Sequence, residues 1–343
     1  MAVQLANALS ERVELSALCC TRKAGPLKTE INTNVKYIEI NKKHALDVFA
    51  LVRLRKFVKT HQIKIIHAHG SSFFIASVLK LFTPQLKLVW HDHYGLTRTN
   101  KLTSSESILT VCSLLFNQVL VVKKELKDWG LKHLKCRKIE LMQNFSTFSP
   151  HKGQKESSAL KGSNDALKII HVANFRPQKD HLTGLKAIQL LKKNNVNVTY
   201  HLFGNFDERD AYYTMLKKFI DANGLRDVVF TYGAKPNISD YLRLADIGIL
   251  TSTSEGLPLS LIEYALAKLP VVVSNAGECK ALVGDFAKVF EPQDYKGLYK
   301  HINKLTSNFE QSNLNAKKLY HKVSKTYGQD AVVSKLIEIY GNL

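Results

Sequence analysis

Long apolar runs, cysteines and acidic residues are all scarce in this chain of 343 residues. The longest apolar stretches, such as 72–79 and 270–273, are far shorter than the ~18 uncharged residues that a membrane-spanning helix needs. We therefore expect no transmembrane segment. Apolar residues make up 45% of the chain and charged residues 23%, which excludes a mainly disordered chain or a fibrous repeat. The length favours two domains.

The five cysteines are odd in number and have neither the CxxC spacing of a zinc site nor the density of a disulfide scaffold. They predict reduced, mostly buried thiols in a cytoplasmic protein. No signal peptide is expected either, because the apolar positions of residues 1–9 recur at helical spacing.

Acidic residues number 29 against 49 Lys and Arg, a formal net charge of +20. Residues 1–150 hold 23 basic and 10 acidic residues, a net +13, so the first half carries most of the excess. This imbalance favours an anionic partner such as a phospholipid surface, a polyphosphate or nucleic acid, and the alternative is that lysine simply dominates the surface. We expect no nucleic-acid binding, because the basic residues have no interleaved aromatics and form no known module.

Short β-branched runs alternate with helical patterns along the chain, which predicts parallel strands buried on both faces. The fold class is therefore α/β, with two doubly wound Rossmann-like domains. We expect a first domain over 1–150, a linker over 151–166, a second domain over 167–322 and a C-terminal helix over 323–343 that packs on the first domain. Strands are expected at 13–19, 35–40, 63–69, 86–91, 118–122, 138–142, 167–172, 198–203, 228–232, 247–251 and 269–273.

The segment 246–278 carries the most chemical information. A strand is followed by a polar turn, by Glu255-Gly256-Leu257-Pro258, and by a helix that is expected to run to Lys268. The amides at the start of this helix suit a phosphate, and Gly256 permits close approach of the backbone. Glu255 and Glu263 are placed to accept hydrogen bonds from sugar hydroxyls; the alternative is a capping carboxylate plus a surface acid.

The frame SxxEGLPLSLIEYALAKLPVVVSN resembles the retaining glycosyltransferases of family 4, which have the GT-B fold, two Rossmann-like domains facing a central cleft. The resemblance extends over essentially the whole chain. It implies that Glu255 contacts the hydroxyls of the donor sugar and that Glu263 contacts the ribose of the nucleotide. It also places Gly256, Leu257 and Pro258 in the donor site.

A second matching segment, residues 170–181, lies at the start of the second domain. The resemblance implies that Arg176 and Lys179 bind the nucleotide diphosphate and neutralise the leaving group. The family's usual pattern has an arginine directly after a glycine, whereas Ala173-Asn174 stands here. Gly204 and Tyr232 end two strands that resemble the lining of the family's nucleotide pocket.

Histidines follow two strands of the first domain. Family members carry a histidine near the reacting sugar and the acceptor, a role that the resemblance gives to His93 and next to His91. His69 and His67 are expected to line the cleft or to be hydrogen-bonded structural residues. A metal is an alternative for the His-Asp-His sequence, but residues i and i+2 share one face with no third ligand nearby in the sequence, and no Asp-x-Asp is present, so no metal is expected.

The resemblance implies transfer of a sugar from a nucleotide-diphosphate sugar to a glycan or lipid-linked acceptor of bacterial surface polysaccharide. Retention by front-side attack needs no carboxylate nucleophile. A nucleotide-sugar 2-epimerase and an inactive donor-binding remnant remain alternatives. The second follows because family members begin with a strand and a glycine-rich loop, whereas this chain starts at the helix that follows them.

The helix expected over 44–61 is amphipathic and basic. Leu51, Leu54 and Val58 recur at helical spacing, and such a helix suits a peripheral enzyme on the inner face of the cytoplasmic membrane. The alternative is a packed domain helix with a solvated basic face. The cations of this helix are Arg53, Arg55, Lys56 and Lys59.

Overall fold

The computed structural model describes residues 1–93, 103–146, 159–235 and 237–343. They form two compact units, one of residues 1–145 with 329–343 and one of residues 146–328. Residues 151–158, the first half of the linker expected over 151–166, lie outside the described residues. None of the helices in the described ranges is both long and apolar enough to cross a lipid bilayer.

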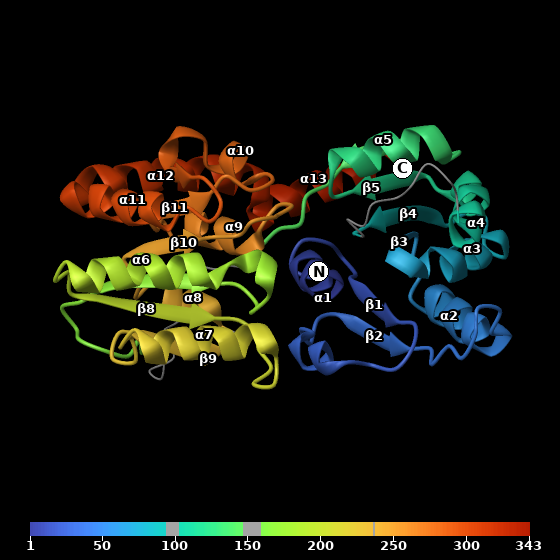
Figure 1. The fold of residues 1–343 in the computed structure, drawn as a ribbon. Helices are drawn as coiled ribbons and strands as arrows, with labels where there is room; N and C mark the ends of the chain where they lie inside the picture. Colours follow the sequence, from blue (N-terminus) through green and yellow to red (C-terminus); the bar gives the residue numbers. More distant parts are fainter. Residues whose placement is uncertain (94–102, 147–158, 236) are drawn as a thin grey trace. The chain divides into compact units, whose positions relative to one another are not determined.

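The second unit is built on a sheet of six parallel strands in the order β12-β11-β10-β7-β8-β9 (Figure 1). The expected strands at 167–172 and 198–203 are confirmed to the residue. Burial on both faces explains why these strands are mostly apolar, although β7 and β8 also bury His171, Thr199 and His201. The strands are β7 (Leu167–Val172), β8 (Val198–Phe203), β9 (Val229–Gly233), β10 (Ile247–Leu250), β11 (Val271–Ser274) and β12 (Lys288–Phe290).

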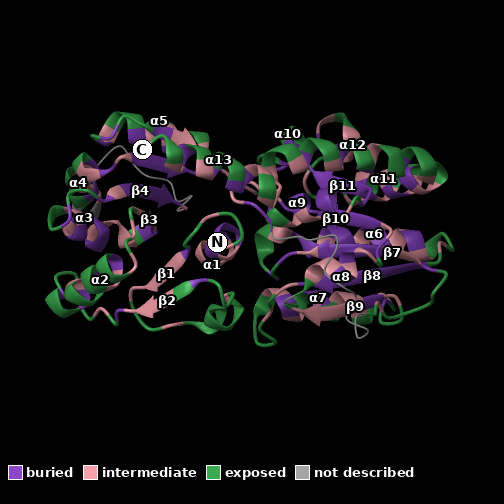
Figure 2. Ribbon diagram, turned by 180° about the vertical axis from the view of Figure 1, so that it is seen from behind, coloured by how far each residue is buried: buried purple, intermediate pink, exposed green. Residues whose placement is uncertain are grey.

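Alternate residues of each strand enter two separate hydrophobic cores. Ile169 and Ile249 belong to one core, whereas Ile170 and Leu250 belong to the other. The first core is closed by α6 (His181–Lys193), α7 (Ala211–Ala222) and α11 (Tyr295–Ser307). The second is closed by α8 (Ile238–Leu242), α9 (Leu259–Leu266), α10 (Cys279–Val283) and α12 (Phe309–Tyr327). In Figure 2 strands β8, β10 and β11 are buried, whereas β9 at the edge of the sheet is mostly half-buried.

The first unit contains two parallel sheets among its described residues, where one was expected. Leu88 and Trp90 face a core with α3, α4 and α5, and Val89 between them faces a core with α1 and α13. The sheets are β3 (Ile65–His69), β4 (Lys87–Asp92), β5 (Gln118–Val121) and β6 (Ile139–Leu141), and β1 (Ala17–Cys20) with β2 (Lys36–Glu39). The helices are α1 (Ala2–Leu9), α2 (Val48–Thr60), α3 (Phe73–Leu81), α4 (Ser104–Cys112), α5 (Lys124–His133) and α13 (Gln329–Gly341).

The strand expected over 13–19 begins only at Ala17. The reason is the turn after α1, in which the amide of Val13 donates to the carbonyl of Leu9 (3.0 Å) and the hydroxyl of Ser16 donates to the carbonyl of Ala6 (2.8 Å). Residues 10–16 therefore follow the helix end instead of extending the strand.

The apolar stripe expected on the helix over 44–61 faces the protein core. Leu54 and Val58 are buried against α3, and Leu51 packs at the edge of the same core. The helix itself is α2, which begins at Val48 after Asp47 accepts a hydrogen bond from the amide of Ala50. This stripe is thus a packing surface, as the alternative interpretation stated.

Tyr264 joins α9 to the two central strands of the second unit. Its hydroxyl accepts from the amide of Val172 (2.6 Å) and donates to the carbonyl of Ile249 (3.2 Å), and the side chain is fully buried. We expect Tyr264→Phe to lower the free energy of unfolding by roughly 1–3 kcal/mol, because two buried backbone groups lose a partner. Urea denaturation measures this. Tyr320→Phe, on the outer part of α12, is the control, and an equal loss there would contradict the assignment.

Candidate active site

The polar site of the second unit lies where the order of its strands reverses. β7 and β10 are neighbours in the sheet, but α6 after β7 and α9 after β10 cover opposite faces. In parallel α/β sheets such a switch point leaves a crevice at the carboxyl ends of the strands. The loops over 173–180 and 251–258 therefore border this crevice, as the sequence predicted for both motifs.

Hydrogen bonds hold these two loops against each other. The hydroxyl of Thr251 donates toward the carbonyls of Lys179 (3.0 Å) and Asp180 (2.8 Å), and the amide of Thr253 donates to the carbonyl of Gln178 (2.9 Å). Thr251 is fully buried, so its hydroxyl is committed to these contacts. The two loops form one structure before any ligand binds.

Lys179 and Glu255 form an ion pair across the two loops. The Nζ of Lys179 lies 2.6 Å from Oε1 of Glu255, and the hydroxyl of Ser252 donates to the same oxygen at 2.6 Å. The Glu255 side chain is 7% exposed and that of Lys179 is 24% exposed. Removing either partner would leave a largely buried charge unpaired. The structure thus brings together two residues that the sequence assigned to the diphosphate and to the sugar.

The turn that carries Glu255 is supported by a loop that the sequence reasoning missed. Gly277 has a φ of +53°, and a Cβ there would overlap the carbonyl oxygen of Glu255. The amide of Glu278 donates to the carbonyl of Gly256 (3.1 Å). A glycine shortly after strand β11 was the available signal, because a left-handed backbone favours glycine.

Helix α9 follows this turn in the sequence and carries Glu263. The helix begins at Leu259 with Pro258 before it, and it ends at Leu266, short of the expected Lys268. Glu263 accepts a hydrogen bond from the hydroxyl of Ser146 (3.3 Å). Burial raises the pKa of the Glu263 carboxyl to about 7, although the hydrogen bond from Ser146 lowers it in part.

The other predicted donor residues occupy different surroundings. Arg176 is exposed at the start of the loop over 173–180, and Leu257 is half-buried against the second core. Gly204 has a φ of +150° and lies against the carbonyl of Ala173, so a Cβ would overlap that group. Tyr232 stacks on Phe203, and its hydroxyl accepts from the amide of Lys161 (2.8 Å). Tyr232 is therefore held in place by Phe203 of β8 and by the backbone of Lys161.

Two buried histidines lie beneath the loop that carries Lys179. His171 stacks on His181 at 4.6 Å, and His181 stacks on Phe175 at 4.4 Å. Nδ1 of His171 lies 2.8 Å from the hydroxyl of Tyr200. Burial lowers the pKa of both histidines, that of His181 to about 4, so they are neutral packing residues near pH 7.

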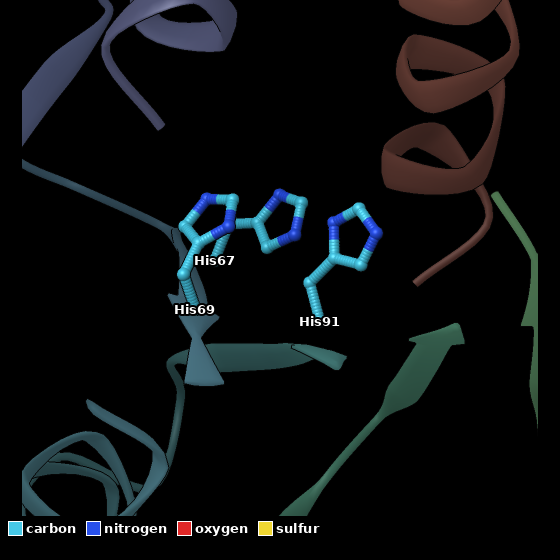
Figure 3. A group of neighbouring side chains, drawn as sticks. All are labelled: His67, His69 and His91. Atoms are coloured by element: carbon cyan, nitrogen blue, oxygen red, sulfur yellow. The ribbon is translucent and has the colours of Figure 1, made fainter. Parts of the chain in front are cut away.

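The histidines of the first unit converge at the ends of β3 and β4. His67 and His69 come from β3 and His91 from β4, where His69 and His91 are register partners (Figure 3). One ring nitrogen of each lies within 4.8 Å of the others. His93, directly after β4, lies 2.8 Å from His69 between ring nitrogens. His91 and His93 have no third potential ligand nearby in the sequence, but the fold brings His67 and His69 of β3 next to them.

The parallel sheets with helices on both faces define a two-domain α/β protein of the GT-B class. Residues 153–322 match the family described as Glycosyl transferases group 1, and residues 1–145 match Glycosyltransferase Family 4. The chain belongs to glycosyltransferase family 4, a family of sugar-transferring enzymes, as the motif resemblance predicted.

The named relatives are about a fifth to a quarter identical in sequence to this chain. The chain is 24% identical over 304 residues to the phosphatidylinositol N-acetylglucosaminyltransferase GPI3 subunit of Saccharomyces cerevisiae, covering 84% of this chain and 66% of that protein. It is 21% identical to the UDP-Gal:alpha-D-GlcNAc-diphosphoundecaprenol alpha-1,3-galactosyltransferase of Escherichia coli, covering 80% of this chain and 74% of that protein. The chain thus spans about two thirds to three quarters of these relatives.

Solved structures show the same fold. The crystal structure of HepE from Anabaena in complex with UDP superposes with a TM-score of 0.77 at 16% identity and covers 100% of this chain and 96% of that one. The expected GT-B fold is thereby confirmed.

The raised pKa of Glu263 predicts a pH-dependent stability. Its folded-state pKa of about 7 lies above the ordinary value of 4.5, so the folded state binds the proton more tightly. Stability therefore falls as pH rises from 4.5 to 7. We expect Glu263→Gln to stabilise the protein by roughly 1–2 kcal/mol above pH 7 and to have little effect below pH 4.5. Urea denaturation over this range tests it, with exposed Glu310→Gln as control; a pH-independent effect would contradict the prediction.

Proposed function

We propose that this protein transfers a sugar from a nucleotide-diphosphate sugar to a glycan or lipid-linked acceptor, with retention of anomeric configuration. The observation that carries the proposal is the Lys179–Glu255 pair at the switch point of the second sheet. It offers a cation for the diphosphate beside a carboxylate for sugar hydroxyls. Family membership supports the assignment of these roles.

The donor site uses charges that this chain itself supplies. Lys179 and Arg176 would neutralise the diphosphate, Glu255 would accept hydrogen bonds from the sugar hydroxyls, and Glu263 from the ribose. Gly256, Leu257 and Pro258 would form the turn against the donor, with Gly204 and Tyr232 on the nucleotide side. With these cations in place, we propose that the transfer step at the donor site needs no metal ion.

In the reaction, the bond from the anomeric carbon to the β-phosphate oxygen breaks and the bond to the acceptor oxygen forms on the same face. The acceptor's hydroxyl proton passes to the leaving phosphate. Lys179 and Arg176 stabilise the charge that develops on this phosphate. Glu255 is already held by Lys179 and Ser252, so it orients the sugar and forms no covalent bond to it. His93, followed by His91 and His69, would lie on the acceptor side.

The names of two relatives support a lipid-linked acceptor. One acts on phosphatidylinositol and the other on a diphosphoundecaprenol, and both names specify a lipid. We propose a similar acceptor in bacterial surface polysaccharide such as lipopolysaccharide, O-antigen or capsule. The protein would then work as a peripheral protein on the inner face of the cytoplasmic membrane.

The surface that would meet such a membrane lies on the outer sides of α2, α3 and α4 (Figure 2). Arg55 of α2 donates to the carbonyl of Phe82 (3.3 Å), which links the end of α3 to α2. The 44 residues from 48 to 91 contain seven Lys and Arg and no Asp or Glu. Basic residues beside apolar ones bind anionic lipid surfaces. The exposed apolar residues here are Leu46, Val48, Phe49, Val52, Leu81, Phe82, Ile108, Val111 and Leu114.

We expect one or more nucleotide-diphosphate sugars to raise the melting temperature of the wild-type protein. Glu255→Gln and Lys179→Ala should each lower the affinity for that donor at least tenfold, because each change leaves the other residue without its ion-pair partner. Each should also lower kcat/KM at least a hundredfold. Titration by calorimetry and product analysis measure both effects.

Exposed Glu310→Gln is the matched control for this experiment. Unchanged donor affinity in Glu255→Gln would refute the assignment. Isomerisation of the donor without an acceptor would identify an epimerase, and binding without turnover would identify a donor-binding protein; either result refutes the proposed transfer.

The membrane surface predicts binding to vesicles that contain phosphatidylglycerol, weakening as salt rises. Phe49 is 78% exposed, so Phe49→Asp should reduce vesicle binding at least fivefold without unfolding the chain. Leu314→Asp is the control, because Leu314 is an exposed leucine of α12 in the other unit. Co-sedimentation measures the bound fraction. Equal binding by Phe49→Asp and the wild type would remove the membrane surface from the proposal.

A further inference from the structure

Four imidazole side chains gather on one face of the four-stranded sheet in the first unit. His67 and His69 are two residues apart on β3, His91 lies on β4, and His93 follows it. Side chains two apart on a strand share a face, and His69 pairs with His91 in the register. The rings of His67 and His69 stack at 4.5 Å, and those of His67 and His91 at 5.2 Å. The cluster therefore combines ligands from two strands.

Some ring nitrogens of the cluster have hydrogen-bond partners, whereas others have none among the described residues. Nδ1 of His67 lies 2.7 Å from the hydroxyl of Tyr340 on α13, and Nδ1 of His69 lies 2.8 Å from Nε2 of His93. Nε2 of His67 is buried without a hydrogen bond among the described residues. The main chain of Met142 lies beside His91, yet neither ring nitrogen of His91 makes a hydrogen bond of ordinary geometry in the described chain.

Burial keeps these imidazoles neutral. Desolvation, followed by the neighbouring rings, lowers the pKa of His69 to about 3 and places the pKa values of His67 and His91 well below their usual range. Desolvation lowers the pKa of His93 to about 4. Metal ions bind the lone pair of a neutral imidazole nitrogen.

We propose that His67, His69 and His91 bind a divalent transition-metal ion of the zinc class. A set of imidazole nitrogens suits zinc, nickel, copper and cobalt, whereas magnesium and calcium prefer oxygen. Tetrahedral zinc with bonds of about 2.0–2.1 Å needs nitrogens about 3.4 Å apart. The nitrogens here lie within 4.8 Å of one another, and the rings must turn out of their stacked arrangement to reach that spacing.

The surroundings of the three ligands fit this role. Metal-binding histidines usually use their second nitrogen in a hydrogen bond that fixes the ring, and Tyr340 and His93 do this for His67 and His69. Among the described residues, Nε2 of His67 and both ring nitrogens of His91 have no hydrogen-bond partner of ordinary geometry, which is costly in a protein interior. Three protein ligands leave a fourth position for water. This site goes beyond the proposed transfer, in which His69 and His91 would line the acceptor side without a metal ion.

The experiment titrates the full chain, without a histidine tag and freed of metal by a chelator, with Co²⁺ and then with Zn²⁺. We expect one equivalent of Co²⁺ to produce the visible absorption of a tetrahedral nitrogen site, and Zn²⁺ to displace it. His67→Ala and His91→Ala should each weaken Zn²⁺ binding at least a hundredfold. His321→Ala, an exposed histidine of the other unit, should leave it unchanged.

Tyr340→Phe provides a second measurement in case the histidine variants fail to fold. Loss of its hydroxyl should weaken Zn²⁺ binding about tenfold, because it removes the partner that orients His67. Absence of stoichiometric binding by the folded wild-type chain would overturn the proposal, as would unchanged affinity in Tyr340→Phe and in the folded histidine variants. Thermal stabilisation by nucleotide sugars in the same preparations reports separately on the donor site.

Discussion

The requirement to bury both faces of the second sheet determines where this protein can carry charged groups. Helices cover each face with apolar side chains, and most side chains of the strands between them are apolar. The loops after β7 and β10 lie at the carboxyl ends of these two central strands, and the helices that follow, α6 and α9, cover opposite faces of the sheet. The threonines at 251 and 253 join the two loops there, so the crevice is shaped by the backbone before a ligand enters.

The ion pair inside this crevice has a consequence for donor binding. Lys179 and Ser252 both contact Oε1 of Glu255, so the other carboxylate oxygen keeps its capacity to accept from a sugar hydroxyl. A diphosphate beside Lys179 adds negative charge next to a cation whose own partner is already in place. The site is therefore nearly neutral when empty, which limits the cost of keeping a largely buried carboxylate there.

The sequence predicted that Lys179 and Glu255 lie at neighbouring strand ends because they belong to two short segments. Lys179 and Glu255 each follow a strand whose apolar run is unambiguous, so their place at the edge of the sheet follows from parallel topology. The contribution of Gly277 escaped notice, since a glycine's backbone angle and its contact with Glu255 arise only in the folded chain. The extra turn before Ala17 likewise depends on a tertiary hydrogen bond from Ser16 to α1.

The first unit shows where reasoning along the sequence reaches its limit. The stripe of Leu54 and Val58 has helical spacing, but spacing alone cannot tell which of two apolar strips faces the core, and here Phe49 is left outside. The same holds for the histidines, since the partner of His91 comes from a strand more than twenty residues earlier.

The charge pattern of residues 48–91 bears on both the exposed side of α2 and the histidine cluster of β3 and β4. Residues 48–91 have no carboxylate to pair with a buried cation. The Lys and Arg side chains of α2 are exposed, and the half-buried Lys80 donates to the carbonyl of Leu115 and to Oδ1 of Asn117 instead. Histidine alone among the basic residues can lose its proton near neutral pH and enter the interior. Burial accordingly lowers the pKa of His69 to about 3, so this imidazole enters the interior without a charge.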